Sequence, residues 1–242
     1  MDDGKLTTLT KHITTNGTIV LEVVYSNDPR TVERIIKKYE EWLKEEKNKF
    51  VGLDLEYTRK ISYIRQGITV VQLAMREHVL VYHYCRFERS QALLDFLQRK
   101  VVTFTSVDTR SDKTMLARAW IKIPDEHHVD IQRLFCIKGG GERDSMGDLE
   151  AAIIDPSYKN MKKSFPKEKH QFWEWKPLSP IHLEYAAKDG YVSYELYRRI
   201  LIIKHGLRYL HQQQMKERLR PRKNKDEGSS SGWKHRKGNS GW

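Results

Sequence analysis

The segment Phe50-Val51-Gly52-Leu53-Asp54-Leu55-Glu56-Tyr57 decides the fold and holds the first candidate functional residues. Its apolar residues and short length predict a β-strand. Asp54 and Glu56 are two positions apart, so their side chains project from the same face of that strand. Two carboxylates this close repel each other, and divalent cations such as Mg²⁺ or Mn²⁺ compensate that repulsion best. The alternative is a solvent-facing edge strand with its acids on the wet side.

Strand and helix patterns alternate on both sides of this segment. Residues 6–25 predict a β-hairpin around Asn16-Gly17, which is a strong two-residue turn pair. Apolar residues with helical spacing follow. The further expected strands are 68–75, 79–84 and 101–107, and the expected helices are 31–46, 91–99, 111–120, 145–154 and 181–214. This order predicts an α/β domain with a mixed sheet.

Two later segments carry polar residues that attract attention in this context. Asp112 stands where an extended run gives way to a helix, with Asp108 as a neighbouring acid. The plain alternative is that Ser111 or Asp112 caps that helix. Tyr185 and Asp189 are four positions apart on the late helix and therefore share one face. The alternative there is a core tyrosine and a surface aspartate.

Composition and charge restrict the classes of function. The chain has 44 Lys+Arg against 32 Asp+Glu, a net charge of +12, which favours a polyanionic partner, nucleic acid before a membrane surface. No run approaches the ~18 apolar residues of a membrane span. The first residues lack the features of a secretory signal, and Cys85 and Cys136 lie far apart without a CxxC motif. We therefore expect no membrane association and an intracellular location, nucleus or cytoplasm.

The expected domain covers residues 1–215, with the motifs between 50 and 200. Residues 216–242 hold nine Lys+Arg and three Asp+Glu, and Gly, Ser and Lys dominate them. This composition predicts a basic, disordered tail.

Taken together, the acidic motifs resemble those of the DEDDy-type 3′–5′ exonucleases, and more closely the Werner-syndrome-like exonuclease family of the DnaQ-like superfamily. Residues 50–56, 104–116 and 175–189 carry the resemblance, which spans roughly residues 20–205 in consistent order. It implies an RNase H-like mixed sheet flanked by helices. This chain departs from the family at two positions. Family members often have glycine at the position of Asp108 and alanine at the position of Gly190. Glycine instead of alanine at position 190 should cost about 1 kcal/mol of helix propensity.

The resemblance also implies a reaction and roles for five residues. It implies a 3′–5′ exonuclease that uses two divalent ions, Mg²⁺ or Mn²⁺, and releases nucleoside monophosphates from single-stranded nucleic acid. Because no helicase or polymerase is attached in this sequence, we expect RNA rather than DNA as the substrate. Asp54 would bridge both ions, Glu56 and Asp189 would complete the site of the water-activating ion, and Asp112 would hold the other. Tyr185 would position the attacking water and help to deprotonate it.

Residues around these motifs are candidates for binding the strand. Leu55 would pack against the terminal base. Arg59, Lys163 and Lys188 would offset the negative charge of the carboxylates, and Trp173 would stack on an unpaired base. The alternatives are a solvated face for the lysines and core packing for the tryptophan.

A rival class is a catalytically silent nucleic-acid-binding or adaptor protein that keeps the fold. Two Gly-Trp pairs, in Ser231-Gly232-Trp233 and Ser240-Gly241-Trp242, resemble the motifs by which some proteins bind the tryptophan pockets of Argonaute. An Argonaute-type partner and a role in RNA silencing are therefore alternative expectations. Exposed strands would also permit a homo-oligomer.

Overall fold

The computed structural model describes residues 5–15, 17–62, 64–84, 89–137, 144–160 and 165–218. A seven-stranded mixed sheet forms the centre of the fold. Its strands are β1 (Thr8–Thr15), β2 (Ile19–Ser26), β3 (Phe50–Tyr57), β4 (Ile68–Met75), β5 (His78–His83), β6 (Thr103–Ser106) and β7 (His128–Asp130).

The strand order in the sheet is β1-β2-β5-β4-β3-β6-β7. The pairs β1/β2, β4/β5 and β3/β4 are antiparallel, whereas β2/β5, β3/β6 and β6/β7 are parallel. The strand with the two acids, β3, therefore lies between β4 and β6 inside the sheet and is no edge strand. Asp54 faces Gln72 of β4 in the register, and the pairing shifts between Glu56 and Tyr57.

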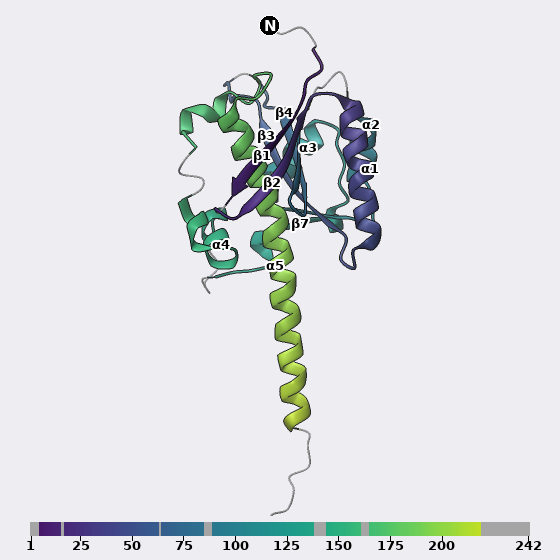
Figure 1. The fold of residues 1–242 in the computed structure, drawn as a ribbon, viewed down its shortest axis with the longest axis vertical. Helices are drawn as coiled ribbons and strands as arrows, with labels where there is room; N and C mark the ends of the chain where they lie inside the picture. Colours follow the sequence, from purple (N-terminus) through teal and green to yellow (C-terminus); the bar gives the residue numbers. More distant parts are fainter. Residues whose placement is uncertain are drawn as a thin grey trace, which may run out of the picture. The chain divides into compact units, whose positions relative to one another are not determined.

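Helices cover both faces of the sheet. Helices α1 and α2 lie together on one side, and the first part of α5 lies on the other side with α4 (Figure 1). Asp28 caps α1 by accepting a hydrogen bond from the backbone N–H of Arg30, and Pro29 is the first helical residue. The helices are α1 (Pro29–Glu45), α2 (Gln91–Leu97), α3 (Thr109–Arg118), α4 (Met146–Ile153) and α5 (Pro180–Arg218), with short 3₁₀ turns at Asp125–His127, Ile131–Arg133, Pro156–Asn160 and Lys167–Gln171.

Two glycines let α5 approach the sheet closely, Gly52 at β3 and Gly190 at β4. A Cβ atom on Gly52 would lie 2.5 Å from the backbone nitrogen of Tyr194 and 2.6 Å from the carbonyl oxygen of Gly190. A Cβ atom on Gly190 would lie 3.0 Å from the Cβ of Gln72. Gly190 lowers the helix propensity of α5, but its lack of a side chain permits close contact between α5 and the sheet. This contact positions Asp189, the residue before Gly190, against β3.

The expected elements are found in the expected order. The structure adds β7 and the 3₁₀ turns, which the sequence patterns did not predict, and it starts the third helix at Thr109 rather than at Ser111. Residue contacts divide the described residues into two units, with the boundary between residues 203 and 204. None of the described helices has a stretch long and apolar enough to cross a membrane.

Candidate active site

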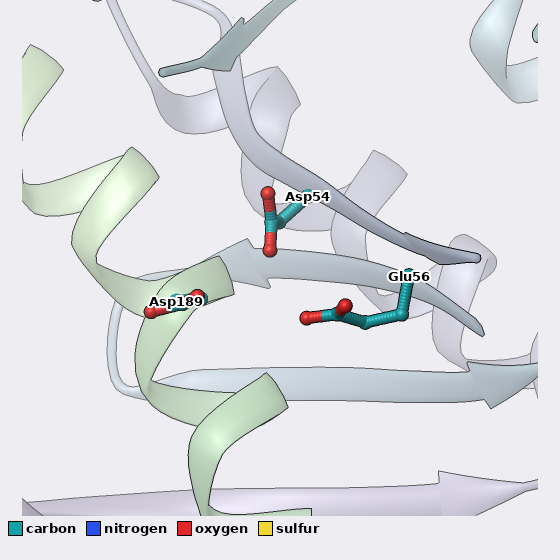
Figure 2. Close-up of side chains that lie close together, drawn as sticks. All are labelled: Asp54, Glu56 and Asp189. Atoms are coloured by element: carbon teal, nitrogen blue, oxygen red, sulfur yellow. The ribbon is translucent and has the colours of Figure 1, made fainter. Parts of the chain in front are cut away.

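Three carboxylates converge where β3 meets α5. Asp54 and Glu56 leave β3 on the same side, toward the helix that carries Asp189 (Figure 2). Ligand atoms from the three side chains all lie within 4.8 Å of one another. The structure therefore joins residues that are more than 130 positions apart in the chain, as the motifs predicted.

The electrostatics of this cluster favour cations. Asp189 is only 3% exposed, and Asp54 and Glu56 are half-buried. Like charges at this separation, away from bulk water, destabilise one another. A divalent ion between the carboxylates would remove that repulsion, and hard oxygen donors suit Mg²⁺ or Mn²⁺. The donor set therefore fits a divalent metal site made by Asp54, Glu56 and Asp189.

Tyr185 lies one helical turn before Asp189 and is half-buried beside the cluster. Burial raises the pKa of its hydroxyl well above the usual value, and the charges of Asp189, Glu56 and Asp54 raise it further. The hydroxyl also forms a hydrogen bond with Asp189. Without a metal ion, Tyr185 is therefore a protonated hydrogen-bond donor at neutral pH and cannot act as a base.

Asp112 lies outside the group of three and is held by a residue that the sequence analysis did not single out. It is 5% exposed, and the hydroxyl of Tyr57 donates a hydrogen bond to its Oδ1. Within the described residues its Oδ2 is buried and accepts no hydrogen bond. Burial raises the pKa of Asp112 to about 7, opposed by the bond from Tyr57 and assisted by the charges of Asp108 and Asp130. A buried carboxylate with one oxygen still available suits a second metal ligand.

The start of α3 corrects the alternative that Ser111 or Asp112 caps the helix. Both residues lie inside the helix, and Asp108 occupies the N-cap position without a side-chain capping bond. Asp108 has a φ of 59°, the left-handed conformation that favours glycine and that aspartate tolerates. The loop therefore keeps the backbone shape for which the resembling family often uses glycine. Asp112 lies in the first helical turn, where the helix dipole favours a negative charge.

A hollow of about 470 Å³ opens beside the carboxylates. Glu56 and Tyr57 form one side of it, and the exposed residues Arg59 and Lys60 lie on its rim with Lys167. The backbone N–H of Arg59 donates to Glu174 at 3.3 Å, which fixes this rim against the segment before α5. The hollow therefore joins a basic rim to the acidic cluster.

The structure describes one of the two other lysines that were predicted to bind the strand. Lys188 is paired with Glu184 at 2.5 Å, so part of its charge is already compensated. Lys163 lies outside the described residues, so its contribution stays a prediction.

Leu55 and Trp173 are core residues in the structure. Leu55 is 4% exposed and alternates with Asp54 and Glu56 along β3, so its side chain is on the opposite face from theirs. Trp173 is 1% exposed, and its ring lies 5.7 Å from that of Phe165 in a stacked arrangement. Trp173 lines the hollow, and its ring packs near that of Tyr185, with the two ring centroids 6.0 Å apart. Neither side chain presents an open face to a base, which corrects the expectation for both.

Gln72 and Tyr57 are the site residues that the sequence analysis missed. Gln72 is fully buried opposite Asp54, and neither polar atom of its amide has a hydrogen-bond partner in the described part of the chain. The one sequence signal that could have indicated Gln72 is the presence of an amide side chain within the apolar run 68–75. Tyr57 ends the strand of Asp54, and only the tertiary structure shows that its hydroxyl reaches Asp112.

A family model described as 3′–5′ exonuclease matches residues 30–202. The match includes all five predicted catalytic residues. The chain belongs to the 3′–5′ exonuclease family. No curated protein sequence matches this exonuclease chain.

Solved structures of several nucleases share the fold of this chain. RNase D of Trypanosoma brucei, in complex with GMP, has a TM-score of 0.61 at 15% identity, over 74% of this chain and 56% of that one. The catalytic core of RRP6 from the same organism has a TM-score of 0.58 at 14% identity, over 84% and 53%. Escherichia coli RNase D has a TM-score of 0.56 at 16% identity, over 74% and 44%. This exonuclease thus spans about half the length of these chains, and the predicted RNase H-like fold and DEDDy-type family are confirmed.

Proposed function

We propose that the protein hydrolyses phosphodiester bonds one nucleotide at a time from the 3′ end of single-stranded nucleic acid, releasing nucleoside monophosphates. The observation that carries this proposal is the convergence of Asp54, Glu56 and Asp189, with Tyr185 one turn away on the same helix face. Membership of the family supports only the class of reaction. The geometry of these four residues additionally supports an intact catalytic site.

The proposed cofactors are two divalent ions, Mg²⁺ or Mn²⁺. When bound, such a pair activates the attacking water and stabilises the departing 3′-oxygen. Asp54, Glu56 and Asp189 would hold one ion, and Asp54 and Asp112 would hold the other. The buried Oδ2 of Asp112 supports its part in this set.

Tyr185 would orient the attacking water. Its raised pKa keeps the hydroxyl protonated, so it can donate one hydrogen bond and accept another. The surrounding aromatic side chains, including Phe165 with a ring centroid at 4.3 Å, fix the ring and exclude bulk water. Tyr185→Phe therefore removes the oriented hydroxyl while keeping the packing.

The proposed substrate is single-stranded, with RNA preferred over DNA. The basic rim at Arg59, Lys60 and Lys167 supports binding of a phosphodiester strand. The RNA preference draws support from the structures of similar fold, because one is described as RNase D with bound RNA U12 and another as an exoribonuclease. Matched RNA, DNA and recessed-duplex oligonucleotides would test the preference directly.

Substitution of the carboxylates tests the proposed reaction. With Mg²⁺ or Mn²⁺, the protein should shorten an oligonucleotide from its 3′ end. Asp54→Asn and Asp189→Asn should each slow the reaction more than about 100-fold, a barrier increase of ~2.7 kcal/mol. Glu41→Gln, which changes an exposed acid on α1, serves as the matched control and should leave the rate unchanged. Gel analysis of end-labelled substrate gives the rates.

Equal rates in all four proteins would contradict the assigned site. Binding of the oligonucleotide without shortening at any metal concentration would instead support the silent adaptor. The Gly-Trp pairs lie outside the described residues, and the Argonaute interaction stays a prediction. Loss of Argonaute in a pull-down with Trp233→Ala/Trp242→Ala would support it, and equal recovery by both proteins would contradict it.

A further inference from the structure

A second hollow, of about 400 Å³, lies between the segment before β4 and the end of α3. Arg65, Arg89 and Arg118 line it, and no acidic side chain is among its described lining residues. Arg65 and Arg118 are exposed and form no ion pair with any described residue. Guanidinium groups bind phosphate oxygens in a planar, two-pronged geometry. The hollow therefore has the chemistry of a phosphate-binding surface.

The same hollow contains an exposed tryptophan in an unfavourable backbone conformation. Trp120 is 77% exposed and has a φ of 59°. It follows the last turn of α3, where its N–H donates to the carbonyl of Ala117 and the N–H of Ile121 donates to that of Leu116. This pair of bonds is the Schellman ending of a helix, which ordinarily has glycine at the position of Trp120. A bulky side chain at positive φ is rare and strained.

Folding alone does not account for this side chain. A core role would bury the indole, whereas most of its surface is exposed to solvent. The helix ending would be served better by glycine, which adopts positive φ without strain. The exposed ring is therefore available for a flat partner. An aromatic ring of this kind is what base stacking requires, and every base offers a suitable face.

Shared residues connect this hollow to the candidate active site. Gln66 lines both this hollow and the one that contains Glu56 and Tyr57. Its amide Nε2 donates to the carbonyl of Thr58 at 2.9 Å, which holds the shared wall in place. Trp120 also lines a third hollow, of about 630 Å³, that contains three lysines. These lysines are Lys100, Lys113 and Lys122. Shared lining residues therefore make the three hollows neighbours, and basic side chains outnumber acidic ones in each, with Asp125 of the third hollow pairing with Lys113.

We propose that the hollow at Trp120 binds an upstream nucleotide of the single-stranded substrate, 5′ of the bond that is cut. The indole of Trp120 stacks on its base, and Arg65 and Arg118 contact the adjoining phosphates. This assignment rests on the proposed exonuclease function, because that function supplies the strand whose 3′ end lies at the carboxylates. It explains how an enzyme with an acidic centre retains a polyanionic strand.

The first test replaces Trp120 with the residue that the helix ending prefers. Trp120→Gly should raise the Kd for an oligonucleotide of about 15 nucleotides roughly tenfold, because one stacked base is lost. It should not lower the midpoint temperature of unfolding, because it relieves the strained backbone. Trp120→Phe, which keeps an aromatic face, should retain most of the affinity. Fluorescence anisotropy with a labelled oligonucleotide, after divalent ions are removed by chelation, measures the Kd.

The second test isolates the phosphate contacts. Arg118→Gln should reduce the slope of log Kd against log salt concentration by about 0.7, the value for one phosphate contact on a single strand. Trp120→Gly should leave that slope unchanged, because stacking releases no counterion. Arg34→Gln, which alters an exposed arginine on α1, is the matched control and should change neither the Kd nor the slope.

These measurements separate this proposal from the proposed reaction, because binding is measured without metal ions and without hydrolysis. If the wild-type protein never shortens the strand but Trp120→Gly weakens binding, the proposed binding site stands and the proposed reaction is contradicted. An unchanged Kd in Trp120→Gly would overturn the binding site and leave the reaction untouched. Displacement of the strand by AMP alone, as efficiently as by unlabelled strand, would also overturn it, because the occupant would then be a single nucleotide.

Discussion

Tyr57 shows how one residue outside the acidic motifs shapes the site. Its hydroxyl donates to Oδ1 of Asp112, which leaves Oδ2 as the buried oxygen available to an ion. Burial raises the pKa of Tyr57 far above its usual value, and the charges of Asp112, Asp54 and Glu56 add to that effect. The hydroxyl is therefore a permanent donor, and it fixes the orientation of the carboxylate in advance.

Removal of that hydroxyl should weaken the affinity of the site for metal ions more than it weakens the fold. In Tyr57→Phe, the Mg²⁺ concentration that gives half-maximal activity should rise by about 10-fold or more, as for other residues that orient a metal ligand. Titration of the rate with Mg²⁺ measures this shift. Tyr209→Phe, at a 62% exposed tyrosine of α5, should keep the original midpoint. An unchanged midpoint in Tyr57→Phe would show that Asp112 needs no such support.

At the scale of elements, the contact between β3 and α5 creates the carboxylate cluster. At Gly52 the backbones of β3 and α5 meet without a side chain between them, and Gly190 of α5 makes room for the side chains of Gln72 and Val79. The neighbouring bond from Thr105 of β6 to the carbonyl of Ser193, at 2.9 Å, adds a second attachment of α5 to the sheet. The spacing between these elements sets the distance from Asp189 to Asp54 and Glu56.

A methyl group at Gly52 should therefore disturb both stability and catalysis. Gly52→Ala would place its Cβ against backbone atoms of α5, which cannot rotate away, and should cost about 1–3 kcal/mol of unfolding free energy. The rate should fall further than the folded fraction does, because Asp189 moves with the helix. Thermal denaturation and rates measured well below the midpoint separate the two effects. Gly206→Ala, with open space around its Cβ position, should be neutral or stabilising.

The whole molecule combines a positive total charge with a negative centre. The net charge of +12 is divided between residues 1–215 and residues 216–242, which contribute half of it. Basic side chains line all three hollows, one of which includes Glu56 of the carboxylate cluster. At low salt the basic surface attracts a strand over a distance, and the short-range chemistry belongs to the acidic cluster.

Buried histidines give the whole fold a dependence on pH. Burial, assisted by the charge of Lys176, lowers the pKa of His83 to about 3, and burial likewise lowers the pKa values of His78 and His128 to about 4. The unfolded chain binds these protons near pH 6.5 and the folded chain does not. The stability that these neutral histidines allow is therefore fully present above about pH 6.5 and is lost as the pH falls toward 4.

Replacement of one of these histidines should reduce the dependence of the unfolding free energy on pH. In His83→Asn, the slope of unfolding free energy against pH between about 6.5 and 4 should decrease by ~1.4 kcal/mol per pH unit, the value for one proton. The asparagine can still meet Tyr25, whose hydroxyl lies 3.0 Å from Nδ1 of His83. Urea denaturation at a series of pH values measures the slope. His211→Asn, at an exposed position of α5, is the control, and an equal change in both variants would contradict the assignment.

The sequence by itself determined the features that depend on near neighbours in the chain. Periodicity indicated most strands and helices, because burial of one face repeats every two or about 3.6 residues. It also placed Asp54 and Glu56 on one face and Tyr185 with Asp189 on another, and the family resemblance joined them into one site. The short strand β7 escaped prediction because three residues are too few to show a period.

Only the tertiary structure decided which of the distant residues meet and which side chains are exposed. It put Trp173 in the core and Trp120 at the surface, although both are tryptophans next to helical turns. It brought Tyr57 to Asp112 and buried Gln72 opposite Asp54. The reason is that the pattern of apolar residues indicates only which face of a single helix or strand is buried. The distances between elements depend instead on how closely they pack, here through glycines that permit backbone contact.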